Sequence, residues 1–549
     1  MDKEIEKSLR ETVSDLPASP GVYIYKDLRG RVIYVGKAKS LKSRVSSYFN
    51  SSHADSEKTR LLVQAIREID FILTENELEA LLLESTLIKK HRPRYNIRLK
   101  DDSGYPFLKL TNEDFPRLQF VRRIQKDGAT YFGPYSSAAG VRGTVRFLKR
   151  VFPLRYCDRM KKQPCIYYHL EKCPGPCSGD VSPGEYAENV RAITLFLEGR
   201  AHEVVRNIES AMKEAAAGQH FERAAVLRDR LQALQSVIGE KQTVIFPDRR
   251  DRDIIGIASG ENLACAEIMF IRDGRLTGHD PVILDISKGE QPPDILTAFI
   301  SLYYEQASSI PGEVLMSHEP HEPELITRML REKAGRAVTL RVPKRGEKKK
   351  MLEHALRNAR RRLEDEQRRT TMDRENRRRM TQAITARVES RKLIRRIICF
   401  DISTIQGTNT VGAAVAFLDA KPDKNNYRKF IIRSGGRDDF SSMREMAKRF
   451  FSRVISGDEQ APDLVIVDGG KGQVSAVQEG IHDSGINTPP VVIGYAKKTG
   501  ISHVMGQETP IVFDAGEPAS ELVQRCIAEA HRFAISFHRK KRGESMLES

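Results

Sequence analysis

The feature that most constrains the fold is a pair of apolar runs in the last third of the chain, each leading into an aspartate. RIICF precedes Asp401 and LVIV precedes Asp468. Between them the hydrophobic pattern predicts two further strands, at 411–418 and 427–433, and a helix over 441–455. A lone aspartate at a strand end is usually a turn residue, so the pair carries the argument.

This order of strands resembles that of ribonuclease H-like folds, and the predicted domain covers residues 396–540. The resemblance implies that the first and fourth strands lie side by side and bring their terminal carboxylates together. Paired carboxylates are costly unless a divalent cation neutralises them, and such cations can clamp an in-line phosphoryl displacement. Further candidates are Asp438 or Asp439, before the helix, and His531 in EAHRFAI. A histidine on a helix is more often structural than a ligand, but this one falls where the fold places its last ligand.

The first 100 residues form a second candidate nuclease module. Two β-rich runs, at 21–25 and 31–35, predict a hairpin that is followed by two helices, a strand at 69–73 and an amphipathic helix at 75–91. GVYIY and VIYVGKAKSLKSRVSSYF resemble the motifs of GIY-YIG nucleases. The resemblance implies that Tyr34 is a general base and Glu84 a metal ligand. It also implies that five residues position or stabilise phosphate: Tyr23, Lys37, Arg44, Tyr48 and Asn96. Taken singly, each would be an ordinary packing or surface residue.

Four cysteines lie within 21 residues, in a segment (101–195) that we expect to be irregular because it is rich in Pro, Gly and aromatic residues. They are Cys157, Cys165, Cys173 and Cys177. The spacing C-x7-C-x7-C-x3-C differs from the C-x2-C pairs of a zinc ribbon. Zinc and a four-cysteine [4Fe–4S] cluster both remain open, and buried or free thiols are the third alternative.

Charge points to a polyanionic partner. The chain carries 91 Lys and Arg against 74 Asp and Glu, a formal charge of +17. Residues 341–396 hold 21 basic and 8 acidic residues, so this helix-compatible segment alone contributes +13. Arg360, Arg361 and Arg362 are therefore candidate DNA contacts, although a solvated charged helix would look the same. The segment ends a mixed α/β region that covers 244–395.

Composition restricts the class of protein. Charged residues make up 30% and hydrophobic types 40%, as in a soluble multidomain α/β chain of three to five domains. No run approaches the roughly 18 apolar residues of a membrane helix, and the start, MDKEIEKSLRE, lacks the apolar core of a signal peptide. We therefore expect a cytoplasmic protein with no membrane partner.

The order of modules resembles the UvrC family of bacterial excinucleases, which act in nucleotide excision repair. The resemblance rests on the motifs above, on FERAAVLRDRL, which is similar to the UVR motif, and on PDLVIVDGGKGQ and EAHRFAISFHR. It implies dual incision of damaged double-stranded DNA, 3′ of the lesion by the GIY-YIG site and 5′ by the ribonuclease H-like site, with Mg²⁺ or Mn²⁺. It also implies a [4Fe–4S] cluster on the cysteines, UvrB docking on the helical hairpin at 196–240, loading by UvrA, and a place in the SOS response.

Two features depart from the family pattern. Thr404 stands where the family commonly has His in D-x-S-H, and the chain ends at HRKKRGESMLES, where the family continues into a helix–hairpin–helix unit. We read that His as supporting rather than liganding, and the helix–hairpin–helix unit as absent. The rival interpretations are a single-incision relative built on the GIY-YIG module and a non-catalytic scaffold that bridges UvrB and DNA.

Overall fold

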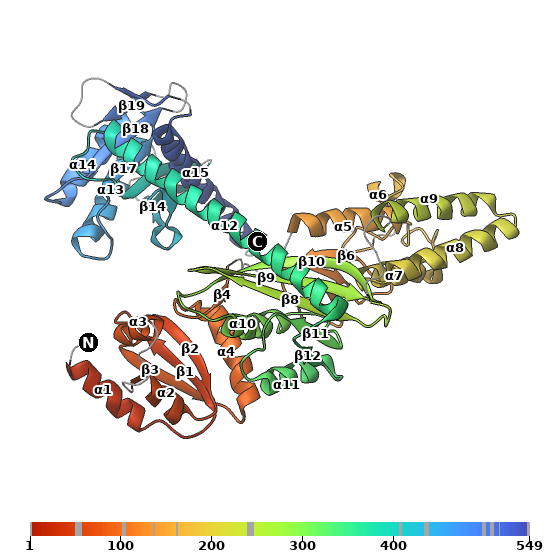
Figure 1. Cartoon of the computed structure of the whole chain (residues 1–549). Helices are drawn as coiled ribbons and strands as arrows, with labels where there is room; N and C mark the ends of the chain where they lie inside the picture. The colour runs from red at the N-terminus through yellow and green to blue at the C-terminus, as the bar shows by residue number, and fades with distance from the viewer. Residues whose placement is uncertain are drawn as a thin grey trace. The chain divides into compact units, whose positions relative to one another are not determined.

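The computed structural model is multidomain α/β, and it describes residues 3–49, 57–100, 106–135, 138–160, 163–238, 246–405, 409–432, 439–496, 501–504, 510–514 and 516–545. It divides into two compact units, Met1–Gln367 and Arg368–Ser549, which are taken separately below (Figure 1). None of the helices in the described ranges combines the length and apolar character that crossing a bilayer requires.

The predicted N-terminal module is confirmed as a three-stranded antiparallel sheet with helices. Its sheet has the order β2-β1-β3. The last helix, α4, begins where the Asn76 side chain accepts a hydrogen bond from the Glu79 N–H at 2.9 Å, and it ends at Arg92, in a left-handed conformation just before Pro93. One helix, α1, was not predicted. The elements are α1 (Lys3–Ser14), β1 (Gly21–Lys26), β2 (Val32–Ala38), α2 (Leu41–Phe49), α3 (Glu57–Ala65), β3 (Glu68–Leu73) and α4 (Glu77–His91).

The prediction that residues 101–195 are irregular was wrong. The segment holds a small sheet of order β6-β5-β7 and three helices around a core of its own. Its strands are three or four residues long, too short to show a period. The overlooked signal was the capping box of α7, in which Ser182 and Glu185 bond each other's backbone. The elements are β5 (Phe107–Leu110), β6 (Leu118–Val121), β7 (Thr130–Phe132), α5 (Ala138–Val151), α6 (Ile166–His169) and α7 (Pro183–Leu197).

The helical hairpin predicted at 196–240 is present as α8 (Ala201–Ala217) and α9 (Phe221–Ile238). It has no separate core, because Ile208 and Leu234 pack into the same cluster as the small sheet.

A six-stranded sheet of order β12-β11-β8-β9-β10-β4 follows. Its edge strand β4 (Arg98–Leu99) comes from the end of the N-terminal module and pairs with β10. Helix α12 (Gly346–Arg387) covers this sheet with Leu352, Ala355 and Ala359, which are buried. The other elements are β8 (Arg252–Ser259), β9 (Leu263–Arg272), β10 (Arg275–Asp285), α10 (Pro292–Tyr304), β11 (Glu313–Met316), α11 (Pro323–Ala334) and β12 (Thr339–Arg341).

The second unit is built on a sheet of order β15-β14-β13-β17-β18-β19-β20, with β16 paired to β14. As predicted, the first strand, β13, lies beside β17 and parallel to it. Helices α13 and α14 pack on one face and α15 on the other (Figure 1). The elements are β13 (Arg396–Ile405), β14 (Asn409–Leu418), β15 (Lys421–Pro422), β16 (Arg428–Ile431), α13 (Asp439–Ile455), β17 (Leu464–Asp468), α14 (Lys471–Ser484), β18 (Val491–Ala496), β19 (Ile501–Val504), β20 (Ile511–Val512) and α15 (Pro518–Ser545).

Candidate nuclease sites

All seven first-site candidates line one cavity of about 1,320 Å³ in the first unit. The lining includes the phenols of β1, β2 and α2, the carboxylate of α4 and residues that follow β10 and precede α11. The predicted residues in it are Tyr23, Tyr34, Lys37, Arg44, Tyr48, Glu84 and Asn96. Residues that sequence analysis placed on separate elements therefore meet at a single surface.

Tyrosine hydroxyls form a chain in this cavity. The hydroxyls of Tyr23 and Tyr48 lie 3.0 Å apart, and Tyr48 donates to the Tyr34 hydroxyl at 3.4 Å. Burial raises the pKa of Tyr34 well above its usual value, and the neighbouring Tyr48 raises it further. Tyr25, which sequence analysis did not single out, packs against Tyr23 and Tyr34 with ring centroids 5.2 and 5.9 Å away. The alternation in GVYIY, which puts both β1 tyrosines on one face, was the available signal.

Gly36 was also overlooked, although it lies within the YVG motif. A Cβ at this position would lie 2.3 Å from the Tyr23 hydroxyl oxygen, so only glycine lets that ring approach β2.

Glu84 is the acidic centre of the cavity. Burial raises its pKa from 4.5 to about 7, although the Lys37 N–H donates to its Oε1 at 3.0 Å and favours the ionised form. A cavity-lining carboxylate in this state suits a divalent cation, which would offset its charge. The Lys37 ammonium pairs with Glu322 and lies 3.6 Å from Glu77. Glu322 comes from the start of α11, and its distance in sequence left no signal that it would reach this cavity.

Arg44 and Asn96 hold the cavity in shape. The guanidinium of Arg44 lies 5.5 Å from the centroid of the Tyr48 ring. Asn96 is buried and uses its amide on the backbone of Val35: Oδ1 accepts from the N–H at 2.9 Å, and Nδ2 donates to the carbonyl at 2.7 Å. In this structure Asn96 therefore fixes β2 next to Tyr34.

The second set of candidates lies in the second unit, at the carboxyl end of the parallel pair. The pairing of β13 with β17 ends at Phe400 and Val467, so Asp401 and Asp468 are the next residues on adjacent strands. Burial raises the pKa of Cys399 well above its usual value. The neighbouring Cys526 and the negative charges of Asp401 and Asp468 raise this pKa further. The prediction that β13 ends at Asp401 was wrong, because its antiparallel pairing with β14 continues to Ile405.

The remaining candidates of this site differ in how well the structure supports a place beside the two aspartates. His531 on α15 has Nδ1 3.9 Å from Oδ2 of the buried Asp401. Asp439 is the exposed first residue of α13, and Asp438 lies outside the described residues. Thr404 pairs with Thr410 across β13 and β14. Within the described ranges no three His, Cys, Asp or Glu side chains are arranged as a metal site, but carboxylates such as those of Asp401 and Asp468 are the donors that suit Mg²⁺ or Mn²⁺.

The sheet of the first unit repeats this topology without the carboxylates. Met316 on β11 lies opposite Ile255 on β8, as Val467 lies opposite Phe400 in the second unit. The next residues are Gly256 and Ser317. A Cβ on Gly256 would lie 2.8 Å from the backbone of α12, and the Ser317 hydroxyl accepts from the Ile257 N–H at 3.2 Å. This copy carries no acidic residue at either strand position.

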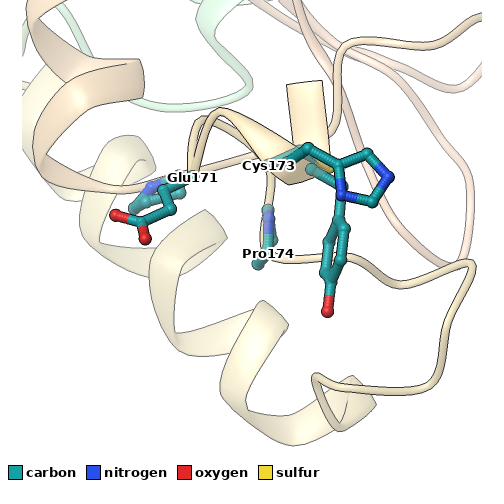
Figure 2. Close-up of a pocket in the computed structure, with 6 residues that line it drawn as sticks. Glu171, Cys173 and Pro174 are labelled. Carbon is teal, nitrogen blue, oxygen red and sulfur yellow. The ribbon is translucent and has the colours of Figure 1, made fainter. Parts of the chain in front are cut away.

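The four clustered cysteines are free thiols that influence one another. Burial raises the pKa of Cys173, and the thiols of Cys157, Cys165 and Cys177 raise it further. Figure 2 shows Cys173 with Glu171 and Pro174 beside a cavity of about 430 Å³. The other three thiols therefore lie near Cys173, although the four are not arranged as a metal site within the described residues.

The three candidate DNA contacts on α12, Arg360, Arg361 and Arg362, are exposed.

Comparison with known families accounts for most of the chain. The matching family models are the UvrC-like GIY-YIG domain (residues 19–97), the UvrC/Cho excinuclease middle domain (105–196), the UvrB/uvrC motif (203–237), the UvrC ribonuclease H-like domain (251–366) and the UvrC RNase H endonuclease domain (385–535).

Full-length relatives agree with these matches. The chain is 40% identical over 567 residues to the UvrABC system protein C of Desulforudis audaxviator, covering 98% of this chain and 90% of that protein. It is 38% identical over 550 residues to that of Moorella thermoacetica, covering 98% and 89%. Among solved structures, the magnesium-bound GIY-YIG N-terminal domain of UvrC from Thermotoga maritima is 42% identical, covering 18% of this chain and 99% of that one with a TM-score of 0.16. The chain therefore belongs to the UvrC family, the endonucleases that make the dual incisions of nucleotide excision repair.

Proposed function

We propose that the tyrosine-lined cavity cuts damaged DNA on the 3′ side of the lesion and that the Asp401 and Asp468 pair cuts it on the 5′ side. The observation that carries this proposal is that the two acidic centres lie in separate compact units and differ in chemistry. The proposal includes a division of the chain into domains 1–100, 101–195, 196–240, 244–395 and 396–540. The protein acts in the cytoplasm in a complex with UvrB, after UvrA has loaded that partner on the lesion.

In the first site Tyr34 receives the proton of the attacking water. Burial and the neighbouring Tyr48 make the free phenolate scarce, so this step depends on the positive charge of Arg44, which lowers the pKa of Tyr34. A divalent cation held by Glu84 would stabilise the negative charge that develops on the phosphate. Lys37 and Arg44 offer two further positive charges in the same cavity.

In the second site Asp401 and Asp468 hold the divalent cations, and His531 lies close enough to orient the Asp401 carboxylate or to join it as a ligand. Asp439, or Asp438, is the accessory carboxylate. Metal dependence is tested by incubating the protein, UvrA, UvrB and a lesion-bearing duplex with chelator, Mg²⁺ or Mn²⁺. Both incisions should disappear in chelator and return with either ion, and incision in chelator would contradict both assignments.

The cysteine set is proposed to hold a [4Fe–4S] cluster, with zinc as the alternative. Its support is the proximity of the other three thiols to Cys173 and the ability of four thiolates to hold either group. Protein purified without oxygen should contain about four irons and absorb in the visible region, and Cys173→Ser should lose most of both. Cys265→Ala, which removes a buried thiol on β9, is the control and should keep them. Stoichiometric zinc without iron would contradict the cluster.

The α8–α9 hairpin is proposed as the docking site for UvrB. It matches the UvrB/uvrC motif and presents Phe221 and Val226 to solvent, with 69% and 52% of their surface exposed. DNA is expected to contact Arg360, Arg361 and Arg362 on α12, which would explain why that helix carries so many basic residues.

A further inference from the structure

Helix α5 of the middle domain carries a row of arginines that the proposed nuclease sites do not use. Arg142, Arg146 and Arg150 are exposed and four residues apart, so they project from one face at intervals of about 6 Å. The opposite face packs into the core through Val141 and Leu148. We call the three residues the α5 arginine row.

The row is electrostatically unfavourable within the folded chain itself. Like charges at i, i+4 destabilise a helix by a few tenths of a kcal/mol per pair, and α5 contains no acidic residue. Some other exposed arginines are neutralised locally, as Arg395 is by Asp419 at 2.7 Å and Arg444 by Asp483 at 2.8 Å. The three arginines of the row form no ion pair with any carboxylate in the described ranges. No carboxylate of the described residues therefore offsets their repulsion, and the row is suited to binding an anion.

A glycine beside the row has no packing reason to be there. Gly143 lies in the interior of α5, three residues before Arg146 and so next to it on the helix surface. A Cβ at Gly143 would meet nothing within 4 Å. Glycine in a helix interior costs roughly 1 kcal/mol relative to alanine, and one use of such a residue is to let a ligand approach the backbone closely.

The positive surface continues onto the neighbouring strand. The guanidinium groups of Arg122 and Arg142 lie 5.9 and 5.8 Å from the centroid of the Phe120 ring. Arg122 follows β6, so the shared ring joins the row to the end of that strand. None of the large apolar side chains that are exposed within the described ranges belongs to α5, so this surface offers charge rather than apolar contact.

We propose that the α5 arginine row binds the phosphate backbone of double-stranded DNA at a place separate from both nuclease sites. Regularly spaced arginines match a ligand with regularly spaced anions, and Gly143 lets its backbone come close. An acidic protein would need apolar contacts that this face lacks. The inference rests on the assignment of DNA as substrate, but it concerns affinity and not cutting.

The test measures binding of the full-length protein to an undamaged duplex in chelator, at several salt concentrations. Three phosphates at about 0.9 each predict that R142Q/R146Q/R150Q lowers the slope of log K against log salt by about 2.7, with at least about tenfold weaker binding at low salt. The control R31Q/R395Q/R444Q removes three exposed arginines that are already ion-paired, and it should change the slope much less.

A second variant separates contact from overall charge. Gly143→Leu leaves the charge unchanged and fits the folded helix, since the space around Gly143 is open. It should weaken duplex binding several-fold while the melting temperature stays the same or rises. Equal slopes for wild type and the triple variant would overturn the proposal. So would unchanged duplex binding together with lost UvrB binding, which would assign the row to a protein partner. Because binding is measured in chelator, neither result depends on whether the nuclease sites are correctly assigned.

Discussion

At the scale of single residues, the proposed chemistry of the first site depends most on Glu84. Its side chain lies against buried tyrosines, and burial raises its pKa to about 7. Burial disfavours the ionised carboxylate because little water is available to solvate its charge. A bound cation would supply the compensating charge, so the same burial favours cation binding at this carboxylate.

In metal-free protein, the burial of Glu84 should reduce the stability of the folded state as the pH rises. An acid whose pKa is raised on folding stabilises the folded state below its unfolded pKa, near 4.5, and that stability is lost as pH rises through about 7. Glu84→Gln removes this titrating group. The free energy of unfolding of the variant should therefore rise relative to that of wild type over that pH interval, and the difference should reach about 1–3 kcal/mol above pH 7. Melting temperatures in chelator from pH 5 to pH 8 measure it. The exposed Glu332→Gln should track wild type throughout, and parallel curves for Glu84→Gln would contradict the burial of this carboxylate.

At the scale of elements, the sequence predicted those with a clear period. The β1–β2 hairpin, α4, the α8–α9 hairpin and the β13–β17 order all follow from apolar spacing and capping residues. The middle domain was missed because its strands are too short to show a period. The end of β13 was misplaced because one neighbour stops pairing at Phe400 while the other continues to Ile405, and a single strand's sequence does not distinguish its two neighbours.

Long-range contacts explain what else the sequence could not predict. The motif residues of the first site were found, but neither the Glu322 contact nor the clamp of Asn96 on Val35 has a local pattern. Asp401 and Asp468 were found because the order of strands resembles that of ribonuclease H-like folds, in which the first and fourth strands are neighbours.

The α8–α9 hairpin gives an element-scale prediction. Since Phe221 and Val226 are exposed, changing both to Ala should alter the free energy of unfolding by less than about 0.5 kcal/mol each. UvrB binding should weaken at least about tenfold, as measured by titration calorimetry. Leu170→Ala, which removes another exposed apolar side chain on a different segment, is the matched control. Unchanged UvrB affinity in the double variant would remove this surface from the interface.

At the scale of the whole molecule, one sheet topology serves two purposes. The copy in the second unit keeps acidic residues where β13 and β17 stop pairing. The copy in the first unit has Gly256 and Ser317 there, fills the space with α12, and contributes residues of α10 and of the segment just before α11 to the wall of the tyrosine-lined cavity. The two proposed catalytic sites thus lie one in each unit.

The most direct test of this account is strand-resolved incision of a lesion-bearing duplex, labelled at both ends, by Glu84→Gln, Asp401→Asn and the double variant with UvrA, UvrB and Mg²⁺. The account predicts that Glu84→Gln loses the 3′ cut by a factor of at least about 100 and that Asp401→Asn keeps it while losing the 5′ cut. An equimolar mixture of the single variants shows whether the cuts can come from different molecules. If Asp401→Asn, folded and UvrB-binding, lost both cuts on the intact lesion-bearing duplex, or if Glu84→Gln kept its 3′ cut, the division into two sites would be contradicted.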